Sequence, residues 1–274
     1  MTVPASWSKV YVELEQLATR LERKKNLNKT GEALTIAAKS ARAVSHITHK
    51  DQTDGALYRR MKLDHIPVPL PANKALHPHG CELTSASVSI LFECWDDLPS
   101  NPVFGSEALD RIRRADMQVR VQGRVSYGDR EVIVEDHWRI DTHHFSDPSV
   151  DPHPWIHYQR GGHAQDTFVK SDGFLPGSCL KDSVFENDIA LSGLMQTPAP
   201  RIATPPLDPL CAIDFVVAQH SGAVWSSLWE DPDYAAHVRR AQERLWDPWF
   251  EAASNRRRRK HVMPFYATPK PLSA

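Results

Sequence analysis

The chain has 274 residues, of which 41% are hydrophobic and 24% charged, and this composition is typical of a soluble globular protein with one large or two small domains. Its formal net charge of -1 gives no argument for a nucleic acid or an acidic membrane surface as a partner of the whole molecule. It has neither a signal-peptide pattern nor an apolar run of the roughly 20 residues that cross a bilayer, and its cysteines form no CxxC pair, so we expect a cytoplasmic protein with free thiols and no membrane contact.

The N-terminal segment, residues 1–64, is predicted to be helical. Apolar residues recur at i, i+4, i+7 and i+11 from Val10, which predicts an amphipathic helix over residues 6–25. An alanine-rich stretch predicts a second helix over residues 31–45. Residues 65–80 contain four prolines and are predicted to form an extended connector, which is the best candidate for an internal boundary.

Residues 81–170 are predicted to form an antiparallel sheet. Apolar and polar side chains alternate over residues 86–94 and again over residues 117–127, which is typical of strands with one buried face. A short helix is expected between them, over residues 106–115. A two-residue turn at Gly128-Asp129 then returns the chain as the second strand of a hairpin.

This turn sets the register of the hairpin. It pairs Val119 with Trp138 and Met117 with Ile140, so that apolar side chains face apolar ones. Trp138 and Ile140 are therefore expected in the core. The opposite, polar face receives the alternate residues of the returning strand, which are Glu135, His137, Arg139, Asp141 and His143.

Residues 155–160 are predicted to form a strand beside this one and antiparallel to it. The simplest register places His157 opposite Asp141 and Gln159 opposite Arg139, with their Cβ atoms about 5 Å apart. An aspartate orients an imidazole and an arginine holds an anion, a combination that suits acid–base cleavage of a phosphate ester without a metal. The predicted site residues are His157, Asp141, Arg139, His143 and Gln159.

Other interpretations of this cluster stay open. Exposed sheet faces commonly carry charged pairs, so the same residues would also suit a cross-brace between two strands with no catalytic role. A register shifted by one residue would turn His157 toward the core. A transition metal is a further alternative, although the spacing of its ligands would match no established motif. Those ligands would be His143, His153, His157 and His163, and no other cofactor is expected.

Asp136 is the odd residue of the hairpin, because its position places a carboxylate on the apolar face. A buried carboxylate needs a partner. We expect a structural acid that is hydrogen-bonded to a tryptophan or a backbone group, rather than a catalytic residue.

The pair Asp208-Pro209 is predicted to begin a buried apolar helix that ends near residue 220, since aspartate caps helices and proline suits the first helical position. Another helix is expected over residues 232–246, ended or kinked by Pro248. By composition, the C-terminal part of the chain divides into an irregular segment over residues 171–207, a helical segment over residues 208–260 and a tail over residues 261–274.

Two groups in the helical segment are candidates for partner binding. A basic run suits contact with the phosphates of a nucleic acid, but it also suits a solvated helix C-terminus. This run is Arg256, Arg257, Arg258, Arg259 and Lys260. Four tryptophans at near-helical spacing favour core packing, and a docking surface for a protein partner is the alternative. They are Trp225, Trp229, Trp246 and Trp249.

Together these elements predict an α+β protein with a single domain over residues 1–274. Helices from the N- and C-terminal segments pack on one face of a central antiparallel sheet of at least four strands, and the other face is at least partly open. No Walker A, GxGxxG, GxSxG or HExxH motif is present. We expect either a metal-independent enzyme that cleaves a phosphodiester, with RNA as the expected substrate, or a non-catalytic binding or assembly protein of a cytoplasmic complex.

Overall fold

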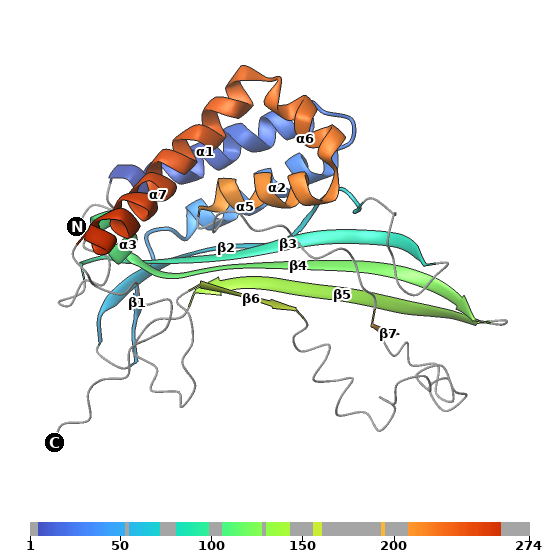
Figure 1. Ribbon diagram of the computed structural model, residues 1–274, viewed down its shortest axis with the longest axis horizontal. Coiled ribbons are helices and arrows are strands. Elements are labelled where there is room, and N and C mark those ends of the chain that lie inside the picture. The colour runs from blue at the N-terminus through green and yellow to red at the C-terminus, as the bar shows by residue number, and fades with distance from the viewer. Residues whose placement is uncertain are drawn as a thin grey trace.

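The computed structural model has two layers, an antiparallel sheet and a layer of helices that covers one of its faces (Figure 1). Helices from both ends of the chain contribute to the helical layer, which confirms the predicted α+β class. The structure describes residues 5–52, 55–71, 81–98, 106–127, 130–142, 156–160, 193–194 and 208–258.

The sheet follows the chain, because the described strands lie in the order β1-β2-β3-β4-β5-β6 and each is antiparallel to the next. A further short strand, β7, pairs in parallel with β5 at residues 134–135, on the same edge that pairs with β6 at residues 138–142. The strands are β1 (His49–Lys50), β2 (Leu57–Pro67), β3 (Glu82–Trp95), β4 (Ile112–Tyr127), β5 (Arg130–Thr142), β6 (Ile156–Arg160) and β7 (Gly193–Leu194).

The predicted hairpin register is the observed one. Met117 of β4 pairs with Ile140 of β5, and Val119 pairs with Trp138. All four side chains are at most 4% exposed and belong to the core between the sheet and the helices. The alternate residues of both strands therefore lie on the face of the sheet that is turned away from the helices.

The helical layer contains two pieces from the N-terminal segment and three from the C-terminal one. Gly31 lies where the two N-terminal helices approach each other, and a Cβ atom there would stand 2.4 Å from the backbone nitrogen of Glu22. Only glycine fits this approach. The described helices are α1 (Ala5–Glu22), α2 (Asn28–Ala43), α3 (Glu107–Asp110), α5 (Pro209–His220), α6 (Gly222–Trp229) and α7 (Pro232–Arg258).

A buried ionic network joins α1, α5 and α7. Arg244 of α7 donates to Glu13 of α1 at 2.7 Å and pairs with Asp208 at 3.0 Å. Asp208 is fully buried and its side chain accepts a hydrogen bond from the backbone N–H of Leu210, so it caps α5 as predicted. The same carboxylate therefore begins one helix and holds another.

Strand β2 lies in the stretch that was interpreted as helical segment and connector, so that interpretation is wrong for residues 57–67. Its buried residues include Met61, Leu63 and Ile66, and the register against β3 shifts between Leu63 and Ile66. Within this irregularity His65 has a φ of 52°. The bulge breaks the alternation by one residue, which explains why the pattern did not indicate a strand.

Two helix boundaries also differ from the predictions. The helix expected over residues 106–115 is a single turn, α3, because the chain enters β4 at Ile112. Pro248 lies inside α7, which continues to Arg258 rather than ending there.

Candidate active site

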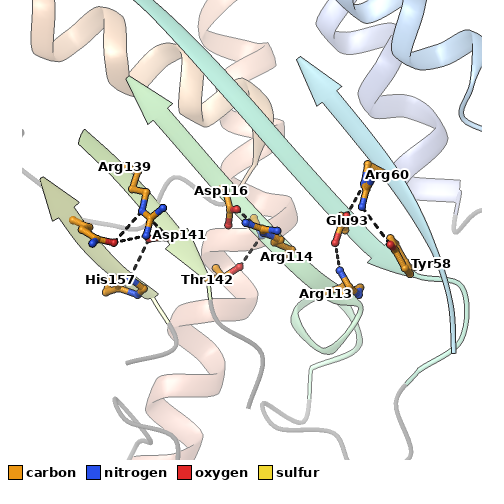
Figure 2. A network of polar contacts seen from close by, with 12 residues as sticks. Tyr58, Arg60, Glu93, Arg113, Arg114, Asp116, Arg139, Asp141, Thr142 and His157 are labelled. Carbon is orange, nitrogen blue, oxygen red and sulfur yellow. Dashed lines mark hydrogen bonds and ion pairs between the residues drawn. The ribbon is translucent and has the colours of Figure 1, made fainter. Parts of the chain in front are cut away.

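The face of the sheet away from the helices carries a row of polar residues across β4, β5 and β6 (Figure 2). His157 of β6 pairs with Asp141 of β5 in the register that the sequence predicted. The His157 Nε2 atom lies 3.2 Å from the Asp141 Oδ1 atom. The side chain of Asp141 is 7% exposed and that of His157 is 16% exposed, so the imidazole is the more accessible of the two.

Arg139 holds the other oxygen of the same carboxylate. Its Nε atom lies 3.0 Å from Asp141 Oδ2, and its Nε and Nη2 atoms both donate to Gln159 Oε1. A guanidinium has five N–H donors, and the two nitrogens engaged here carry three of them. The remaining terminal nitrogen is the one that would meet an anionic ligand. Arg139 therefore fixes the carboxylate and keeps donors for a second partner.

The structure adds a carboxylate that the sequence did not nominate. Asp116 of β4 directly precedes Met117, whose partner is Ile140, so Asp116 lies across from Asp141 on the polar face. It is 5% exposed, and its Oδ2 atom accepts a hydrogen bond from Arg114. The Oδ1 atom has no hydrogen-bond partner among the residues that the structure describes.

The surroundings of Asp116 favour its protonated form. Burial first, and then the negative charge of Asp141, raise the pKa of the Asp116 carboxyl to about 6, although Arg114 opposes the shift. A carboxyl with such a pKa is able to gain and lose a proton near neutral pH. The sequence did contain a pattern that could have indicated Asp116, because it is a polar residue at the start of an alternating strand. The strand was expected to begin one residue later, at Met117.

A second cluster lies next to this row, toward β2 (Figure 2). The register shift between Glu93 and Cys94 leaves Arg113 as an extra residue of β4. Arg113 pairs with Glu93 and Asp51 and lies over the Tyr58 ring, 4.2 Å from its centroid. Because each charge in this cluster has an opposite partner in contact, we assign it a structural role.

The opposite face carries the pair that fixes the register of β6. Asp136, 3% exposed, accepts two hydrogen bonds from Arg160, with Nε–Oδ1 at 3.2 Å and Nη2–Oδ2 at 2.7 Å. The predicted structural acid is therefore present, but its partner is an arginine of β6. A one-residue slip of β6 would break this pair and turn His157 to the helical side.

Several predicted residues lie outside the part of the chain that the structure describes. They are His143, His153, His163, Arg259 and Lys260. Arg256, Arg257 and Arg258 belong to the last turn of α7, of which only the backbone is described. Within the described ranges, no group of three or more histidine, cysteine, aspartate or glutamate side chains is placed to hold a metal ion.

The four C-terminal tryptophans are partly buried and pack against the core. The indole N–H groups of Trp225 and Trp229 both donate to Asp214 Oδ1, at 2.9 and 3.0 Å, and the Tyr234 hydroxyl donates to the same oxygen at 2.8 Å. Shared contacts of this kind tie α5, α6 and α7 together. They match the core-packing interpretation of these residues.

Cys94 and Cys211 are free thiols, Cys81 is buried, and Cys179 lies outside the described residues. Burial raises the pKa of the Cys94 and Cys211 thiols, which disfavours the thiolate that a nucleophile needs. The polar row on β4–β6 is therefore the better candidate for chemistry.

No family model, curated protein or solved structure gives a significant match to this chain. In the part of the chain that the structure describes, every helix is too short or too polar to span a bilayer. The assignment of a function therefore depends on the geometry of the polar row itself.

Proposed function

We propose that this protein is a metal-independent enzyme that cleaves phosphodiester bonds in RNA in the cytoplasm, and that His157 is its proton-transfer residue. The observation that carries the proposal is the contact of His157 Nε2 with the Asp141 carboxylate, at 3.2 Å, in a carboxylate that Arg139 also holds at 3.0 Å. A histidine oriented by a carboxylate is the usual arrangement for acid–base catalysis.

Each residue has a defined part in this reaction. The Asp141 carboxylate lies 3.2 Å from Nε2 of the imidazole and orients the ring, and His157 is the residue that exchanges a proton with the substrate. Arg139 contributes donors to a phosphate oxygen, and Gln159 keeps the guanidinium in place. The choice of RNA follows from chemistry, since the ribose 2′-hydroxyl supplies a nucleophile that needs only a base to activate it.

The proposal is tested by incubating the full chain with a fluorescent single-stranded RNA in the presence of a metal chelator. We expect cleavage by the wild-type protein and a loss of about 10²–10⁴-fold in His157→Ala, the usual contribution of a general acid or base. His137→Ala is the matched control, because His137 lies on the polar face of the same β5 strand, about 13 Å along it from Asp141.

Thermal melting decides whether a lost activity reflects chemistry. His157→Ala is expected to keep a melting temperature close to that of the wild type, since the side chain is partly exposed at the sheet edge. Cleavage that survives in His157→Ala would refute the assignment. A wild-type protein that binds RNA without cleaving it would favour the alternative, a non-catalytic binding protein.

A further inference from the structure

Three acid–base side chains lie in one line across adjacent strands. Asp116 on β4, Asp141 on β5 and His157 on β6 occupy neighbouring positions on the polar face. Neighbouring strands lie about 4.8 Å apart, so the backbones that carry Asp116 and His157 are about 10 Å apart. Asp141 lies between the two, so a phosphodiester group that contacts both Asp116 and His157 would lie over the Asp141 carboxylate.

Charged groups on every side of Asp116 define its environment. On its own strand Arg114 holds the Oδ2 atom, and across the strand pair Asp141 contributes a negative charge. On the other side, the residue opposite Asp116 is Leu91 of β3, whose own partner on β2 is Lys62. Arg114 and Arg139 thus flank the two carboxylates and offset their charge where an anionic substrate would bind.

The Asp116 carboxyl can accept more hydrogen bonds than the fold supplies to it. Its side chain is 4% exposed, and although the carboxyl interacts with Arg114 and with the backbone of Thr142, its Oδ1 atom has no hydrogen-bond partner among the described residues. Buried oxygens of this kind are rare in native proteins, and where they occur they often belong to functional sites. A substrate oxygen, or a proton on the carboxyl, would satisfy the atom.

We propose that Asp116 is a second catalytic residue of this site, the general acid that protonates the leaving oxygen while His157 acts as the base. This assignment rests on the proposed function. His157 accepts the proton of the ribose 2′-hydroxyl as that oxygen forms a bond to phosphorus. The Asp116 carboxyl gives its proton to the 5′-oxygen as the bond from phosphorus to that oxygen breaks.

The products of this step are a 2′,3′-cyclic phosphate and a free 5′-hydroxyl, so all atoms and protons are accounted for. The enzyme is left with a protonated His157 and an ionised Asp116. Exchange of both protons with water restores the starting state, and no metal, oxidant or other reactant takes part.

The test compares two substrates with different leaving groups. An RNA dinucleotide leaves as an alkoxide that needs a proton, whereas uridine 3′-(4-nitrophenyl) phosphate leaves as a phenolate that does not. We expect Asp116→Asn to slow cleavage of the dinucleotide by about 10²-fold or more and to change cleavage of the aryl ester by less than about tenfold. His157→Ala is expected to slow both substrates, since both need the base.

Asp64→Asn is the matched control, because Asp64 pairs with Lys62 on β2 of the same sheet and lies outside the row. It is expected to change neither rate, and circular dichroism confirms that each variant is folded. An Asp116→Asn variant that slows both substrates equally, or neither, overturns the role of Asp116 while leaving that of His157 intact. A wild-type protein that cleaves neither substrate overturns the proposed function and the Asp116 assignment together.

Discussion

Replacing Asp116 by asparagine is expected to stabilise the protein at alkaline pH, although the residue belongs to the candidate active site. The carboxyl has an ordinary pKa of 3.8 and a pKa of about 6 in the folded protein. The folded state therefore binds the proton more tightly than the unfolded state does. The ionised form is the one that burial and Asp141 disfavour.

The sign and size of the effect follow from this difference. Below about pH 4 the carboxyl is protonated in both states and imposes no cost, whereas the folded state loses stability as the pH rises from about 4 through about 6. A pKa shift of one unit corresponds to about 1.4 kcal/mol. The shift of the Asp116 carboxyl from 3.8 to about 6 therefore costs the folded state about 3 kcal/mol once the pH is above about 6. Asparagine has the same shape and no charge, but it weakens the contact with Arg114. We therefore expect a net gain of about 1–3 kcal/mol at pH 8.

Urea unfolding at pH 4, 6 and 8 measures the free energy of unfolding of the wild type and of Asp116→Asn. The difference between the two is expected to be small at pH 4 and to grow toward pH 8 in favour of the variant. Asp141→Asn is the matched comparison, and it is expected to destabilise the protein because Asp141 pairs with Arg139 and His157. An Asp116→Asn variant that is less stable than the wild type at pH 8, or a difference that does not depend on pH, would refute the reasoning.

Two further substitutions test the packing that positions the site. Arg160→Ala leaves the Asp136 carboxylate buried without its bidentate partner, and we expect a loss of about 3 kcal/mol in urea unfolding, with a loss below about 1 kcal/mol contradicting the role of the pair. Gly31→Ala places a Cβ atom 2.4 Å from a backbone nitrogen of α1, so thermal melting is expected to show a destabilisation of about 1–3 kcal/mol, and an unchanged melting temperature would contradict the close helix approach.

The hairpin of β4 and β5 was predictable because a two-residue turn and strict alternation leave only one register. From Val119 opposite Trp138, the polar face followed, and with it the meeting of Asp141 and His157. The register of β6 was the simplest one available, and the Asp136–Arg160 pair on the other face explains why it holds. The need of Asp136 for a partner was predictable, but its identity was not, because the arginine is distant in the chain.

β-Bulges explain why the alternation of apolar and polar residues did not predict strand β2 or the first residues of strand β4. The shift between Leu63 and Ile66 breaks the alternation of β2, and the extra residue Arg113 breaks that of β4 just before Asp116. When one extra residue interrupts the alternation of apolar and polar residues, the sequence pattern no longer predicts a continuous strand. Asp116 lies beyond this irregularity, and it was missed because the expected strand began at the next residue.

The most direct test of the proposed function is the chemical identity of the ends that the wild-type protein leaves on a short RNA in the presence of a chelator. Mass spectrometry distinguishes a 2′,3′-cyclic phosphate with a 5′-hydroxyl from a 3′-hydroxyl with a 5′-phosphate. The account requires the cyclic phosphate, and it requires that an oligonucleotide with 2′-deoxyribose at the cleavage position stay intact. Fragments with 5′-phosphate ends, cleavage of the deoxy substrate, or no cleavage of RNA would each contradict it.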